Sequence, residues 1–148
     1  MSNTNYIEEQ LEEQLNSFSY ARRISALNEI AKLIDDSNVE PLELVNMHMH
    51  SFFSYNMNDY SPARLVLEAR KNRLFAAGLC DFDVLDGLEE FMLAGLKFKV
   101  RTSVFVETRA FFREFADKEI NSPGEPGVIY MMGAGFGRDI DKSEGVYN

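Results

Sequence analysis

The chain contains two histidines, His48 and His50, and a single residue separates them. On a β-strand, side chains two positions apart lie on the same face, and the rise is about 3.3 Å per residue. Two imidazoles placed in this way can bind one cation at about 2.0–2.1 Å. They can equally be structural histidines that form hydrogen bonds near the end of a strand. The spacing alone does not decide between these two roles.

Acidic side chains follow the next two apolar segments of the chain. Asp81 and Asp83 follow the apolar run 75–80, and Glu107 follows residues 100–106, which begin and end on valine and predict a strand. In parallel β/α architectures, functional groups gather at the C-terminal ends of the strands. Imidazoles and carboxylates are ligands that zinc, manganese and iron accept. Each acidic residue alone could be a helix cap or a solvated turn, but together with the histidines they favour a metal site.

The elements that must position these side chains follow from the apolar pattern. Residues 44–50 alternate in polarity, which predicts a strand with Leu44, Asn46, His48 and His50 on one face. A serine followed by a proline at 61–62 is typical of a helix start. The remaining pattern predicts helices over 61–72 and 88–96, and strands over 75–80, 100–106 and 128–132. Strands that alternate with helices indicate an α/β fold with parallel strands.

The N-terminal part of the chain has a different pattern. Apolar residues recur at three- and four-residue spacing from Tyr6 to Ile34, which predicts helix. Ser17 or Ser19 could divide this helix into two, and Pro41 prevents its continuation. We therefore expect an N-terminal helical segment over 1–40 and a second domain over 41–148.

The composition and net charge of the chain indicate which kinds of molecule it could bind. The chain has 148 residues, a net charge of −9 and a hydrophobic content of 45%, which is enough for a packed core. Nucleic-acid binding needs clustered basic residues, so the acidic balance argues against it. A small phosphorylated substrate is compatible with it, because a bound cation can reverse the local field. The chain has one cysteine and no sequence that resembles a signal peptide, which predicts a cytoplasmic protein. It has no apolar run of about 18 residues, so we expect no membrane-spanning segment.

The motifs, taken in order, resemble those of the PHP (polymerase and histidinol phosphatase) domain. They are Asn46-Met-His-Met-His50, Ser54, Ser61-Pro62, Cys80-Asp-Phe-Asp83 and Val106-Glu107. The resemblance covers about residues 44–136. It implies a (β/α)7 barrel that holds two or three divalent ions and hydrolyses phosphoesters.

The resemblance also implies a role for each matching residue. His48 and His50 would bind one metal ion, which is zinc, manganese or iron, and Glu107 would bridge it to a second. Asp81 would contact the metal-binding residues without binding the ion itself, or it would contribute to the pocket. The candidate catalytic residues are therefore Asp81 and Glu107. Two ions so held would lower the pKa of bound water and stabilise the attacking and leaving oxygens of an in-line displacement.

Several positions depart from the PHP pattern. Phe82 stands where the family has a histidine, and Tyr55 and Asn56 stand in place of its Asp-Gly pair. An aromatic ring cannot coordinate, so we expect the third metal site to be lost and at most two ions to remain. Phe82 could stack on a substrate ring, but ordinary packing at a strand end is the more economical interpretation.

Length is a further departure, because a complete barrel needs about 200 residues or more. We therefore expect the chain to be the N-terminal part of a PHP-type barrel. Two alternatives remain open. One is a non-catalytic PHP-like binding or scaffolding module with a degenerate metal site. The other is a plain α/β domain that self-associates through its N-terminal helix.

Overall fold

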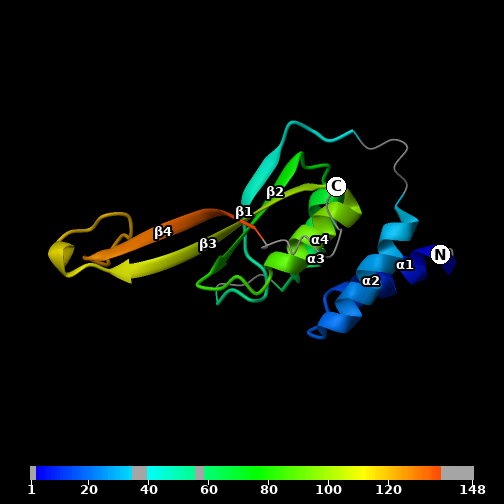
Figure 1. Ribbon diagram of the computed structural model, residues 1–148, viewed down its shortest axis with the longest axis horizontal. Coiled ribbons are helices and arrows are strands. Elements are labelled where there is room, and N and C mark those ends of the chain that lie inside the picture. Colours follow the sequence, from blue (N-terminus) through cyan, green and yellow to red (C-terminus); the bar gives the residue numbers. More distant parts are fainter. Residues whose placement is uncertain (1–2, 35–39, 56–58, 138–148) are drawn as a thin grey trace, which may run out of the picture.

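The computed structural model describes residues 3–34, 40–55 and 59–137, with side chains from Tyr6 onward. The architecture is mixed α/β, with one four-stranded sheet and helices packed on one of its faces (Figure 1). The helices are α1 (Asn3–Leu15), α2 (Tyr20–Leu33), α3 (Pro62–Lys71) and α4 (Leu88–Phe98), and Arg113–Phe115 form a short 3-10 turn. The strands are β1 (Val45–Met49), β2 (Ala76–Phe82), β3 (Arg101–Phe111) and β4 (Val128–Phe136).

The sheet is mostly parallel and does not close. Its order is β1-β2-β3-β4, with β1, β2 and β3 parallel. The expectation of parallel strands throughout is wrong for β4, which pairs antiparallel with β3. A parallel pair needs a crossover of a dozen or more residues that packs over the sheet, usually as a helix. Residues 112–127 contain only the short 3-10 turn and form a hairpin connection instead. Within the described residues the sheet is thus open, and a (β/α)7 barrel remains an expectation.

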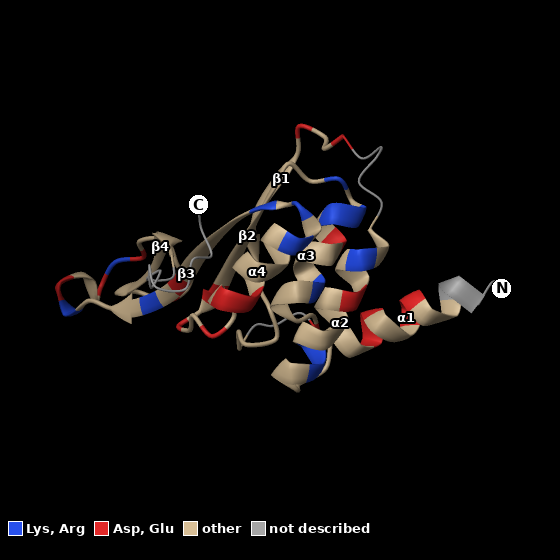
Figure 2. Ribbon diagram, turned by 45° about the vertical axis from the view of Figure 1, so that its right-hand side comes forward, with Lys and Arg blue, Asp and Glu red and all other residues tan. Residues whose placement is uncertain are grey.

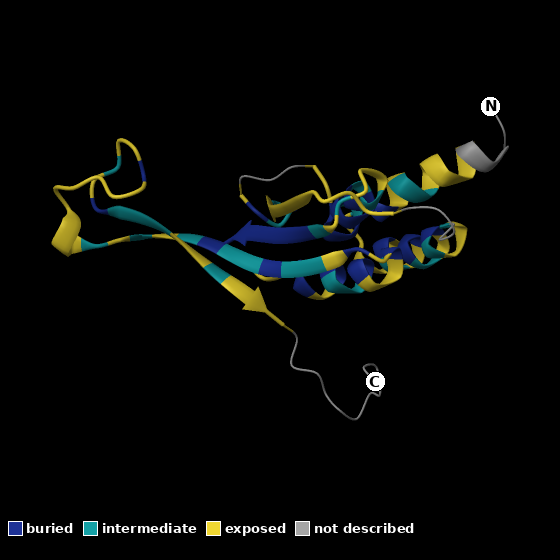
Figure 3. Ribbon diagram, turned by 90° about the horizontal axis from the view of Figure 1, so that it is seen from above, coloured by how far each residue is buried: buried dark blue, intermediate teal, exposed yellow. Residues whose placement is uncertain are grey.

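The hairpin of β3 and β4 projects away from the rest of the molecule (Figures 1 and 3). The last residue of β2 is Phe82, which is opposite Glu107, but β3 continues to Phe111 because β4 supplies it with a new partner. The predicted strand end at Glu107 is therefore wrong. Glu107 lies within β3, at the level where β2 ends.

Helices α3 and α4 cover one face of the parallel strands. Ala77 and Leu79 of β2 and Val104 of β3 are buried against them in a single apolar core. Ser61 starts α3 as predicted, because its side-chain oxygen accepts a hydrogen bond from the backbone N–H of Arg64. This helical layer sets which face of each strand is available for a site.

Helices α1 and α2 pack on the outer side of α3 and α4, and the predicted break between them is confirmed. Leu15 and Leu27 are buried in the same core as the residues of the sheet. Arg64 of α3 forms an ion pair with Glu12 of α1 at 3.0 Å. Figure 2 shows basic and acidic residues interspersed along these helices. In the part of the chain that the structure describes, no helix is both long and apolar enough to cross a membrane.

Candidate metal centre

Strand β1 carries a β-bulge next to the two histidines. Asn46 pairs with Ala77, and Met49 pairs with Leu79, so three steps along β1 match two steps along β2. The side chain of Asn46 accepts a hydrogen bond from the backbone N–H of His48 at 3.1 Å. Such a local bond offers the backbone an alternative to regular pairing and favours the bulge.

The bulge changes which side chains share a face. The uniform alternation predicted over residues 44–50 is wrong, because Asn46 and Met49 both pair with core residues of β2. His48 and His50 flank Met49 and therefore point to the opposite face, away from α3 and α4. Glu107 lies three residues after the core residue Val104 on β3 and points to that same open face.

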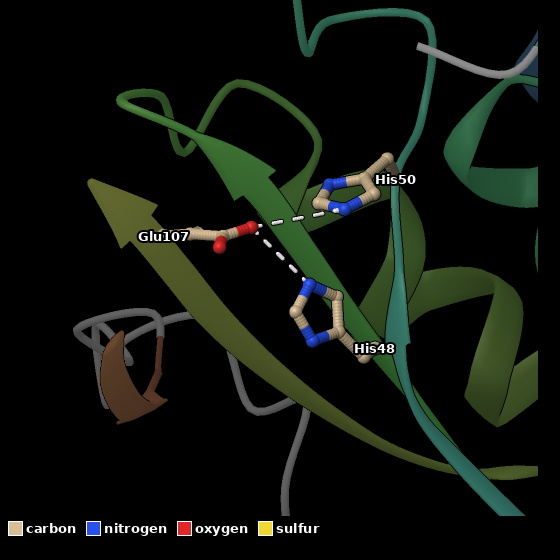
Figure 4. A group of neighbouring side chains, drawn as sticks. All are labelled: His48, His50 and Glu107. Carbon is tan, nitrogen blue, oxygen red and sulfur yellow. Dashed lines mark hydrogen bonds and ion pairs between the residues drawn. The ribbon is translucent and has the colours of Figure 1, made fainter. Parts of the chain in front are cut away.

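The side chains of His48, His50 and Glu107 converge there, and Figure 4 shows all three pointing toward one another. Nε2 of His48 lies 3.2 Å from Oε2 of Glu107, and Nε2 of His50 lies 3.8 Å from the same oxygen. One ligand atom from each residue falls within 4.8 Å of the other two. The two imidazole rings meet edge to face, with centroids 4.9 Å apart.

This spacing fits a divalent ion. Tetrahedral ligands about 2.05 Å from zinc lie about 3.3 Å from one another. The two imidazole-to-carboxylate distances of 3.2 and 3.8 Å bracket that separation, so small side-chain movements would place all three atoms at bonding distance. Two imidazoles and one carboxylate are also a donor set that zinc, manganese and iron accept. A hydrogen bond from His48 to Glu107 accounts for the first distance, and the convergence of all three groups makes the cluster a candidate for metal binding.

Burial differs among the three side chains. The side chain of His48 is 44% exposed, that of His50 is 17% exposed, and that of Glu107 is 11% exposed. A nearly buried carboxylate is poorly screened by water, so its charge attracts a cation more strongly than a surface glutamate does. The exposure of His48 leaves an approach from solvent. The centre is thus a negative, partly enclosed site with one open side.

The neighbouring thiol reports the same negative field. Burial, together with the negative charges of Glu107 and Asp81, raises the pKa of Cys80 to about 11. The thiol is therefore protonated near neutral pH, and only a thiolate binds a metal well. Cys80 packs as a small apolar residue beside the site.

The structure keeps Asp81 out of the converging group. Its two carboxylate oxygens accept hydrogen bonds from the backbone N–H and the hydroxyl of Ser51, each at 2.6 Å. Burial raises the pKa of Asp81, and the two bonds from Ser51 and the charge of His50 act against that rise. Sequence reasoning singled out Asp81 but missed Ser51, and the only signal for the pair was a hydroxyl residue directly after His50.

Asp83 and Phe82 lie beside Asp81 in the sequence, but their side chains have different environments. Asp83 accepts a hydrogen bond from the hydroxyl of Thr108 and has a positive φ of 58°. Phe82 is buried and packs edge to face against Tyr55 and Tyr130, with centroid distances of 4.7 and 5.8 Å. Its ring is covered by two tyrosines, which agrees with the packing interpretation. Asn56 lies outside the described residues.

A cavity of about 700 Å³ adjoins the histidines, and His48 and His50 are part of its lining. It lies between β1 and α3 and includes polar groups from both. The lining residues are Asn46, His48, Met49, His50, Asp59, Tyr60, Leu65, Glu68, Ala69, Asn72 and Leu74. Its size suits a small molecule.

Comparison with known proteins gives one structural likeness. No protein-family model matches the chain, and no curated protein matches it. A solved structure from Bifidobacterium adolescentis, described as a "putative metal-dependent phosphoesterase", is similar to the chain with 21% identity and a TM-score of 0.49. The match covers 64% of this chain and 28% of that chain, so this chain corresponds to less than a third of the other protein. The assignment of the centre therefore rests on the geometry of this chain's own residues.

Proposed function

We propose that the chain contributes a divalent metal centre to a PHP-type hydrolase that cleaves phosphoesters. The observation that carries this proposal is the convergence of His48, His50 and Glu107 on the open face of the sheet. The order of motifs along the sequence supports the choice of reaction, because it resembles the PHP pattern. The ions would be zinc, manganese or iron, with two in a complete domain.

Each residue has a distinct part in this proposal. His48 and His50 would hold one ion through neutral imidazole nitrogens. Glu107 would supply the negative charge and, with two carboxylate oxygens, could bridge to a second ion. When bound, a divalent ion supplies a Lewis acid that lowers the pKa of water and offsets the charge of a phosphoryl group. That positive charge also explains how a chain with a net charge of −9 could accept a small phosphorylated substrate.

Glu107→Gln tests this proposal because it keeps the size of the side chain and removes its charge. Hydrolysis of p-nitrophenyl phosphate with added Mn²⁺ or Zn²⁺ is the measurement. We expect kcat/KM to fall by more than the roughly 10- to 100-fold that loss of an outer-shell partner costs. Glu125→Gln is the matched control, because Glu125 forms its ion pair with Arg109 on the hairpin. Equal activity in wild type and Glu107→Gln would refute the catalytic role.

A non-catalytic PHP-like module is the second candidate. The observation that favours it is Phe82, which fills the position of a family metal ligand and is buried between two tyrosines. This candidate predicts that the chain binds metal but hydrolyses no aryl phosphate under any metal. The same assay with metal content measured in parallel separates the two candidates.

A further inference from the structure

His50 lies where the regular pairing of β1 has ended. The last pair between β1 and β2 is Met49 with Leu79. Beyond it, the chain enters the loop that leads to α3. A metal ligand at this position needs support from its backbone, because the direction of its side chain depends on the backbone on both sides of its Cα.

Ser51 provides that support through Asp81. The backbone N–H of Ser51 belongs to the peptide that joins His50 to Ser51, and it donates to Oδ1 of Asp81 at 2.6 Å. The hydroxyl of Ser51 donates to Oδ2 of the same carboxylate at 2.6 Å and accepts from the backbone N–H of Phe53 at 3.2 Å. Both residues are buried, at 0% and 1% exposure for Ser51 and Asp81. The peptide plane after His50 is therefore fixed to β2 by a two-point contact.

Asp81 is placed to act through Ser51 and not on a substrate. It alternates with Cys80 and Phe82 along β2, so it points to the helix-facing side of the sheet, opposite the converging ligands. A Cβ built on Gly87, the residue before α4, would lie 3.2 Å from Oδ2 of Asp81. The carboxylate is thus enclosed between the sheet and the start of α4.

We propose that Asp81 and Ser51 are positioning residues that fix the backbone after His50 and so hold its imidazole in the metal centre. This inference rests on the proposed function, because it takes His50 to be a metal ligand. It predicts that metal affinity depends on a hydroxyl whose hydrogen bonds go to Asp81 and to the backbone N–H of Phe53. His48 is held separately, by the bulge and by Asn46.

The test compares two buried serines that make equivalent hydrogen bonds. The hydroxyl of Ser61 donates to the backbone oxygen of Leu15 at 2.7 Å and accepts from the backbone N–H of Arg64 at 3.0 Å, and Ser61 is also 0% exposed. Ser51→Ala and Ser61→Ala therefore remove similar hydroxyl bonds, but only the first touches the segment next to a ligand. The affinity for Zn²⁺ and for Co²⁺ alone is measured by calorimetric titration, together with the visible absorption spectrum of the Co²⁺ form and the thermal unfolding of each variant.

We expect Ser51→Ala to weaken metal affinity by about 10- to 100-fold, as loss of an outer-shell partner does. Its Co²⁺ spectrum should change, because the coordination geometry changes when His50 is no longer held. Ser61→Ala should lower the unfolding temperature and leave affinity and spectrum as in wild type. Ser51→Thr, which retains the hydroxyl, should restore both.

Two results would overturn the inference. The first is a metal affinity in Ser51→Ala that is unchanged from wild type. The second is an equal loss of metal affinity in Ser51→Ala and Ser61→Ala, because an equal loss would show that lower stability alone weakens binding. Wild-type protein that binds neither Zn²⁺ nor Co²⁺ would contradict the proposed function as well. Wild-type protein that binds metal with the same affinity and spectrum as Ser51→Ala would contradict only the positioning role.

Discussion

The double variant His48→Ala/His50→Ala is expected to lose metal binding while it keeps its fold. It removes two of the three donors, and the remaining carboxylate of Glu107 cannot hold a divalent ion alone. Affinity should therefore fall by more than the roughly 10- to 100-fold that loss of an outer-shell partner costs. Because His48 is half exposed and His50 lies at the end of β1, neither residue is part of the apolar core. The far-ultraviolet circular dichroism of the variant should match that of wild type.

Thermal unfolding with and without added metal measures the loss directly. A ligand that binds only the folded state stabilises it by about 2.7 kcal/mol at a concentration of 100 times Kd. Wild type should therefore unfold at a higher temperature when Zn²⁺ or Mn²⁺ is present, and the variant should not. A double variant Glu8→Gln/Glu9→Gln removes two exposed carboxylates from α1 and controls for weak binding to the acidic surface. Equal stabilisation of wild type and of the histidine variant by metal would show that the ions bind elsewhere.

The largest effect on stability is expected from Glu90→Ala, which breaks a buried ion pair. Glu90 of α4 accepts hydrogen bonds from Nε of Arg23 at 3.0 and 2.8 Å and pairs with its Nη2 at 2.7 Å. It also accepts from the backbone N–H of Ala63, at the start of α3, at 3.1 Å. Both charged side chains are almost completely buried. The pair therefore joins α2, α3 and α4 where no water can replace a missing partner.

Removing Glu90 leaves the guanidinium of Arg23 buried without its counterion, which should lower the free energy of unfolding by about 3–5 kcal/mol. The carbonyl oxygens of Ser17 and Phe18 still accept from Arg23, but they carry no full negative charge. Urea denaturation followed by circular dichroism gives the difference. Glu29→Ala is the control, because Glu29 pairs with Lys32 on an exposed face of α2. That change should cost about 0–1 kcal/mol, and equal losses in the two variants would contradict the structural importance of the buried pair.

The parallel part of the fold was predictable from local sequence signals. Ser61 followed by Pro62 gave the start of α3, and its hydroxyl makes the capping bond that such a pair predicts. The apolar run 75–80 predicted a strand buried on both faces, and β2 is buried along most of its length. These signals are reliable because each one depends on neighbouring residues and on a single layer of packing.

The antiparallel strand and the bulge could not be predicted in the same way. The direction of β4 depends on the path of the connecting segment 112–127. That segment is rich in proline and glycine, and its sequence has no periodic pattern that specifies the path. The bulge in β1 depends on one side-chain bond, from the backbone N–H of His48 to Asn46, which competes with regular pairing.

The converging residues of the candidate site were predictable from the sequence, but the hydrogen bonds around them were not. His48, His50 and Glu107 were singled out by residue type and by their places near strand ends, and the structure brings them together. Ser51 was missed because a hydroxyl residue directly after His50 does not by itself indicate which group that hydroxyl contacts. Its importance appears only when Asp81, thirty residues later, is found to accept both of its hydrogen bonds.

The most direct test of the metal centre is anomalous X-ray diffraction from crystals grown with Zn²⁺. We expect a strong anomalous peak about 2.0–2.1 Å from Nε2 of His48 and from Nε2 of His50, and at a similar distance from a carboxylate oxygen of Glu107. The peak should disappear below the zinc absorption edge. If these three side chains face different directions and every zinc ion in the crystal lies elsewhere, the chain has no metal centre on this face of the sheet.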